Sequence, residues 1–105
     1  MKEIQKKIKI FCKENDMESS VEHRTLDLMS ELGEVAKEIL KMSNYGKKPI
    51  EYREELKSEI GDVFYSLITL ANILNIDLED SLNQVLKKYQ KRLAKGSAGS
   101  ENDSL

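Results

Sequence analysis

Two six-residue segments of the chain, 30–35 and 58–63, repeat one pattern: serine, acid, aliphatic residue, glycine, acid, valine. Each segment lies in a run whose apolar residues recur at helical spacing, so its two acids fall on one side of a helix, about one turn apart. If these two helices pack face to face, they bring together the carboxylates of Glu31, Glu34, Glu59 and Asp62. Such a group cannot stay ionised without a counter-charge. The repeat therefore predicts a cation site between two helices.

Helical periodicity extends over most of the chain, and no segment has the two-residue period of a strand. We expect helices at 3–14, 21–42 and 50–74, and a fourth that begins after Asp77, whose side chain is suited to cap it. Residues 95–105 are rich in Gly, Ser, Asn and acids, which is typical of a disordered tail. The sequence thus predicts one all-α, four-helix domain at 1–94 and a polar tail at 95–105.

The apolar stripe of the second helix is formed by Leu28, Leu32, Val35 and Ile39, with the acids along its flank. The third helix has a matching stripe that includes Phe64. The first helix has only about three turns, so it is too short to cover both long helices. We therefore expect a homodimer or a larger assembly to bury the remaining apolar surface.

Composition excludes several classes of partner. The chain has 17 basic and 19 acidic residues and a net charge of −2, so a nucleic-acid surface is not expected. No apolar run is long enough to cross a bilayer, and the N-terminus lacks the apolar core of a signal peptide. The single cysteine, Cys12, excludes an internal disulfide framework and fits a reducing compartment. We expect a cytoplasmic protein without a membrane partner.

The composition of the acidic group selects the metal. Carboxylates without histidine or thiolate partners favour Mg²⁺ or Mn²⁺ over Zn²⁺ or Cu²⁺. A di-iron site would need Glu-x-x-His motifs, and the only histidine, His23, belongs to none. Gly33 and Gly61 each separate two acids inside a helix, where glycine costs about 0.8–1 kcal/mol relative to alanine. A close approach of the helices beside the acids would account for both glycines.

The combination of Glu31-x-x-Glu34 with Glu59-x-x-Asp62, after 24 intervening residues, resembles the signature of the MazG-like nucleoside triphosphate pyrophosphohydrolases. This family belongs to the all-α NTP pyrophosphatase superfamily. The similarity extends from about residue 20 to 93 and includes 28–38, 59–67 and 75–82.

The resemblance implies a MazG-like bundle that assembles as a dimer or a dimer of dimers, with the nucleotide near a subunit interface. It implies Mg²⁺-dependent hydrolysis of a nucleoside triphosphate to a monophosphate and pyrophosphate, in the clearing of unwanted nucleotides. Glu31, Glu34, Glu59 and Asp62 would be both metal ligands and catalytic residues. One of them would also orient the attacking water.

The sequence departs from the family pattern at several positions. Ser30 replaces an acid that often precedes the first motif, and Val85 and Tyr89 replace a lysine and an asparagine of many members. Arg92 matches, and Lys88 lies one turn from it. We assign substrate phosphate contacts to Arg92 and Lys88, with a solvated basic flank as the alternative for both.

Other functions remain open from sequence. The same acids could support dUTP or phosphoribosyl-ATP pyrophosphohydrolysis, and a catalytically silent helical interaction module is the alternative from another class. Glu38, one turn beyond Glu34, is expected on the surface, with support of the metal ligands as the alternative. His23 is expected to be exposed near a helix start, with contact to a nucleobase as the alternative.

Overall fold

The computed structural model describes residues 1–96 and contains four helices and no strand in that range. They are α1 (Lys2–Glu14), α2 (Val21–Met42), α3 (Glu55–Ile73) and α4 (Leu78–Ala94). The predicted all-α fold of four helices is confirmed. The expected tail at 95–105 lies outside the described residues from 97 onward. No helix in the described part of the chain is long and apolar enough to cross a membrane.

The start of α3 differs from the sequence prediction, which placed it at residue 50. Residues 50–54 are not helical, because the Glu51 N–H donates to the carbonyl of Met42 at 2.9 Å and ties this segment to the end of α2. The 43–54 connection also contains Gly46, whose φ of 84° is a left-handed conformation that glycine adopts without strain. Helix α3 therefore begins after a longer turn than its apolar pattern indicates.

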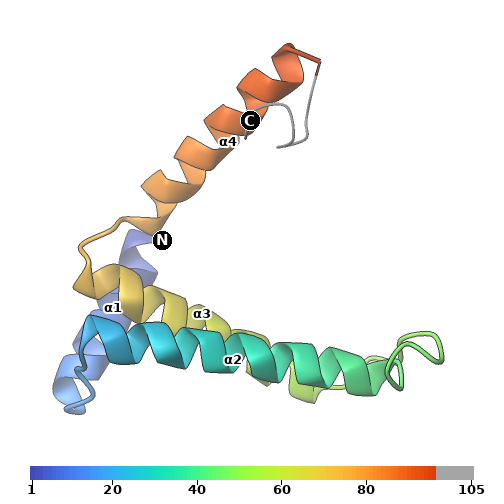
Figure 1. The fold of residues 1–105 in the computed structure, drawn as a ribbon. Helices are drawn as coiled ribbons and strands as arrows, with labels where there is room; N and C mark the ends of the chain where they lie inside the picture. The colour runs from blue at the N-terminus through green and yellow to red at the C-terminus, as the bar shows by residue number, and fades with distance from the viewer. Residues whose placement is uncertain (97–105) are drawn as a thin grey trace.

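Helices α2 and α3 lie side by side and run antiparallel, and α1 packs across the end of α3 (Figure 1). The α2 residues that this packing buries fully or in part follow the 3-4 spacing of a coiled-coil seam: Val21, Arg24, Leu28, Glu31, Val35, Glu38 and Met42. Three of these seven positions are charged. The seam between α2 and α3 is therefore partly polar, and the acids belong to it.

The prediction of which face of α2 packs on α3 is wrong for two of the four residues of the expected apolar stripe. Leu28 and Val35 lie in the seam, but Leu32 and Ile39 are 46% and 39% exposed. On α3, Ile60 and Phe64 are similarly open at 53% and 42%. Helix α2 carries apolar residues on two adjacent faces, and the α2–α3 pair uses only one of them. The other face remains uncovered in the single chain.

Helix α4 projects away from the other three helices (Figure 1), and none of its residues is fully buried. Its apolar side is exposed at Leu82, Leu86, Tyr89 and Leu93. In the single chain α4 therefore does not close onto α2 and α3 to complete a bundle.

Candidate active site

The acidic cluster, defined as Glu31, Glu59 and Asp62, lies on facing sides of α2 and α3. One carboxylate oxygen from each residue lies within 4.8 Å of the others. Glu31 comes from the middle of α2, and Glu59 and Asp62 come from the first half of α3, one turn apart. The antiparallel pairing of the two repeats thus brings three of the four predicted ligands together.

Glu34 is exposed and does not belong to this cluster. Its carboxylate is nevertheless close enough to contribute to the raised pKa of Glu31. The fourth predicted ligand is therefore near the cluster but outside it.

The electrostatics of the cluster are unfavourable without a cation. The pKa of Glu31 is raised above its ordinary value, first by burial and then by the neighbouring charges, chiefly those of Asp62 and Glu59. Within residues 1–96, neither the cluster nor Glu34 makes an ion pair with lysine or arginine. The cluster therefore lacks a protein counter-charge.

A hard divalent cation fits this donor set. All the donors are carboxylate oxygens, the ligands that Mg²⁺ prefers, and opposite ligands of Mg²⁺ are separated by about 4.2 Å. The three oxygens lie within 4.8 Å of one another, so small side-chain rotations would bring them onto one ion. Water and substrate phosphates commonly complete the coordination of such an ion.

The expected role of the two glycines is not supported. A Cβ atom added at Gly33 or at Gly61 would meet nothing within 4 Å. Both residues are exposed, because they lie on the sides of α2 and α3 that face away from the seam. No close helix approach within the single chain requires them.

Sequence reasoning missed a buried ion pair beyond the cluster. Glu38, expected on the surface, is only 7% exposed, and its Oε1 lies 2.7 Å from Nε of Arg53. Arg53 comes from the non-helical segment before α3 and also contacts the exposed Glu55. The 24-31-38 heptad spacing could have indicated that Glu38 shares the seam with Glu31.

Replacing Arg53 with methionine is expected to lower the free energy of unfolding by about 2 kcal/mol, because it leaves the buried Glu38 carboxylate unpaired. The matched control is Glu55→Gln, which removes the exposed partner of Arg53 and should lower the free energy of unfolding much less. Urea unfolding at one protein concentration measures both. Equal stabilities of the two variants would show that the Glu38–Arg53 pair does not stabilise the fold.

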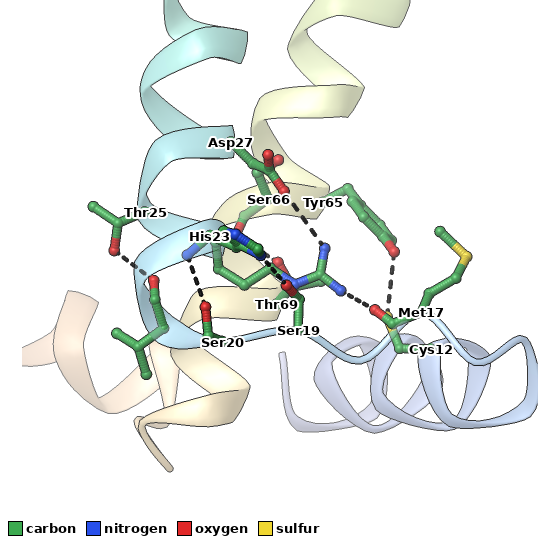
Figure 2. A network of polar contacts seen from close by, with 12 residues as sticks. Cys12, Met17, Ser19, Ser20, His23, Thr25, Asp27, Tyr65, Ser66 and Thr69 are labelled. Carbon is green, nitrogen blue, oxygen red and sulfur yellow. Dashed lines mark hydrogen bonds and ion pairs between the residues drawn. The ribbon is translucent and has the colours of Figure 1, made fainter.

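A second polar network closes the other end of the seam (Figure 2). Arg24 is 7% exposed; its Nη2 donates to the carbonyl of Met17, and its Nη1 lies 3.9 Å from Asp27. The hydroxyl of Tyr65 on α3 lies 3.2 Å from the thiol of Cys12 on α1. Burial raises the pKa of Tyr65, and its contact with Cys12 adds to the effect, so the phenol stays neutral. This network joins α1, α2, α3 and the α1–α2 connection at that end of the seam.

The predicted substrate contacts, Lys88 and Arg92, lie on α4 and are not brought to the acidic cluster within one chain (Figure 1). With Lys91 and Lys95 they line one hollow on the helix surface. The guanidinium of Arg92 lies 5.3 Å from the ring centre of Tyr89. Tyr89 departs from the family pattern, and its ring contacts Arg92, the residue of α4 that matches the pattern. His23 is exposed, as expected, and its backbone N–H donates to Oγ of Ser20, the N-cap residue of α2.

Comparison with known families decides what kind of domain holds this cluster. The model of the MazG nucleotide pyrophosphohydrolase domain matches residues 19–96. The chain belongs to the MazG family. The matched range contains α2, α3 and α4, and with them both acid motifs. The family resemblance predicted from the sequence is confirmed.

Relatives in the MazG family differ in how much of their length the chain covers. YpjD of Bacillus subtilis is 44% identical over 68 residues, which are 62% of this chain and 60% of YpjD. The nucleoside triphosphate pyrophosphohydrolase MazG of Thermotoga maritima is 35% identical over 51 residues, 49% of this chain and 20% of that protein. Gene 37 protein of Mycobacterium phage L5 is 32% identical over 82 residues, 76% of this chain and 72% of the phage protein. The chain thus spans less than two thirds of the length of each of the two bacterial relatives.

Two crystal structures share the MazG fold of this chain. The Bacillus-conserved MazG protein, described as a nucleotide pyrophosphohydrolase, superposes with a TM-score of 0.71 at 31% identity, over 84% of this chain and 86% of that one. Bacillus subtilis YpjD gives the same TM-score at 34% identity, over 84% of this chain and 92% of that one. The fold is therefore that of MazG pyrophosphohydrolase domains.

Neutralising Glu31 is expected to stabilise the metal-free MazG domain. Because the pKa of Glu31 is raised on folding, its ionised form opposes folding, and stability should rise as the pH falls from neutral through that raised pKa. At pH 7, Glu31→Gln should raise the free energy of unfolding by about 0.5 kcal/mol. It should also flatten this pH dependence.

Urea unfolding in the presence of a chelator, repeated between pH 4 and about pH 8, measures both effects of Glu31→Gln. Glu22→Gln is the control, because it removes one negative charge from an exposed residue of α2 outside the cluster. A Glu31→Gln protein that is less stable than the parent at pH 7 would contradict the electrostatic account.

Proposed function

We propose that this MazG domain hydrolyses a nucleoside triphosphate to a nucleoside monophosphate and pyrophosphate, with Mg²⁺ or Mn²⁺ held by the acidic cluster and Glu34. The observation that carries the proposal is the convergence of Glu31, Glu59 and Asp62, from two distant motifs, without a protein counter-charge. Family membership supports the reaction class. The activity for which the Thermotoga maritima relative is named supports a triphosphate substrate.

In this reaction water attacks the α phosphorus, and the bond from that phosphorus to the α–β bridging oxygen breaks. The electron pair of that bond leaves with pyrophosphate, and the proton of the water passes to a carboxylate or to solvent. A divalent cation at the cluster would polarise the phosphoryl oxygens and offset the charge that develops. The seam holds Glu31 and Glu59 in place, and we assign the orientation of the water to the exposed Glu34.

The cations of α4 would reach the site through assembly. We assign phosphate contacts to Lys88 and Arg92, which lie away from the cluster of their own chain (Figure 1). The exposed apolar residues of α4, with those on the open faces of α2 and α3, support a homodimer or a dimer of dimers. In that assembly, α4 of one subunit would lie beside the cluster of another. The biological role we propose is the removal of unwanted nucleotides.

A pyrophosphate-release assay over canonical, deoxy and modified triphosphates tests the proposal. Release from at least one nucleotide is expected with Mg²⁺ or Mn²⁺, and none is expected with a chelator. The panel includes dUTP and phosphoribosyl-ATP, which would identify the alternative superfamily substrates. Absence of release across the panel would instead favour a helical interaction module.

A further inference from the structure

The first turn of α4 is capped by its own N-cap residue, Asp77, and by a side chain of α1. Four backbone N–H groups at a helix start have no partner within the helix. Here the side chain of Asp77 accepts from Glu79 at 2.9 Å and from Asp80 at 3.2 Å, and the backbone carbonyl of Asp77 accepts from Ser81 at 3.0 Å. A third donor of the helix start, the N–H of Leu78, bonds to Oε1 of Gln5 on α1, at 2.9 Å.

Gln5 uses its whole amide at this point. Its Nε2 donates to Oδ1 of Asn72 at 3.0 Å and to the carbonyl of Ile76 at 2.9 Å. Nδ2 of Asn72 donates in return to the backbone carbonyl of Gln5 at 3.0 Å. Gln5 is 8% exposed, so losing these bonds would leave several polar atoms buried and unpaired. One side chain thus joins the last turn of α3, the α3–α4 connection and the first turn of α4.

The ion pairs that join α4 to the N-terminal residues also lie at its start: the amine of Met1 is 3.7 Å from Glu79, and Nζ of Lys2 is 3.9 Å from Asp77. The helix projects away from α1, α2 and α3 (Figure 1), and none of its residues is fully buried. Its direction is therefore fixed at its first turn. We infer that Gln5 is a positioning residue, which sets the direction of α4 and hence the placement of Lys88 and Arg92. The second half of this inference rests on the proposed function.

The test variant is Gln5→Met, which keeps the length of the side chain and removes its hydrogen bonds. The matched control is Cys12→Ala, because Cys12 is the other fully buried residue of α1 and contacts Tyr65 on α3, away from α4. A graded variant, Gln5→Glu, keeps an acceptor for the Leu78 N–H but loses both donors. All three are made in the full chain labelled with ¹⁵N.

Two NMR measurements examine α4 directly, independently of activity. Gln5→Met should speed exchange of the Leu78 amide about tenfold relative to amides in the middle of α2, and Gln5→Glu should speed it less. In Gln5→Met, the residual dipolar couplings of α4 should no longer fit the alignment of α2 and α3. In Cys12→Ala they should still fit. Unchanged α4 couplings in Gln5→Met, or an equal change in Cys12→Ala, would overturn the inference.

Kinetics separate this inference from the proposed function. Gln5→Met should raise KM for the nucleotide about fivefold and change kcat less than twofold, because the cluster itself is intact. An unchanged KM together with altered α4 couplings would overturn the functional half of the inference. If the parent protein releases no pyrophosphate from any nucleotide, the proposed function fails, and the NMR measurements alone decide the role of Gln5.

Discussion

Replacing Glu59 with glutamine is expected to reduce kcat/KM for pyrophosphate release by about a thousandfold. Glu59 is half-buried in the seam, and one of its carboxylate oxygens lies within 4.8 Å of those of Glu31 and Asp62. A neutral amide there keeps the shape of the side chain but removes a charge that would hold the divalent cation. The measurement is steady-state pyrophosphate release with saturating Mg²⁺.

The fold of the Glu59→Gln protein should be intact, since removing one of several like charges does not oppose folding. Its helical content should match the parent, and its unfolding midpoint without metal should be equal or higher. Glu55→Gln is the matched control, because it makes the same change on an exposed residue one turn earlier in α3 and should retain near-parental activity. Retention of more than about a tenth of parental activity by Glu59→Gln would be inconsistent with a ligand role.

Replacing Leu86 with glutamate is expected to dissociate the assembly and with it to abolish most activity. Leu86 is 47% exposed on the apolar side of α4, so in the separated chain a charge there should change stability by less than about 0.5 kcal/mol. In an assembled interface the same charge would be buried without a partner, at a cost of several kcal/mol. Light scattering after size-exclusion chromatography measures the mass of the assembly at each protein concentration.

Gln84→Glu provides the matched control for Leu86→Glu. Gln84 is exposed on the same helix, and two residues of helical rotation place it on the opposite side. This variant should keep both the parental mass and the parental activity. If Leu86→Glu also keeps the parental mass, then α4 is not an assembly face, and the proposed contacts of Lys88 and Arg92 with a neighbouring subunit lose their basis.

The sequence predicted the helices closely where local signals were strong. The predicted range of the second helix, 21–42, is the observed range of α2, and α4 begins directly after its predicted cap, Asp77. The pairing of the two acid motifs also followed from the sequence, because equal spacing within two antiparallel helices places both sets on one seam. These features depend on helix periodicity and capping, which act over a few residues.

The rotation of α2 could not be predicted in the same way. Its apolar residues cover two adjacent faces, and periodicity alone does not say which face packs on α3 and which stays open. The stripe chosen from sequence included Leu32 and Ile39, which are exposed in the single chain. The observed seam instead contains Arg24, Glu31 and Glu38. Charged residues are rarely expected at buried positions.

Contacts made by non-helical segments could not be predicted from the sequence either. Arg53 pairs with Glu38 only because residues 50–54 are held against the end of α2, and Gln5 meets the start of α4 across more than 70 residues of chain. No sequence pattern near these residues indicates either contact. Both depend on where the connections between helices run, which packing of the whole chain decides.

The most direct test of the central claim is a crystal structure of the protein grown with Mn²⁺, examined for anomalous scattering from the metal. An anomalous peak is expected between α2 and α3, within about 2.5 Å of carboxylate oxygens of Glu31, Glu59 and Asp62. Well-ordered carboxylates at this position with no anomalous peak, or Mn²⁺ bound only elsewhere, would contradict the claim.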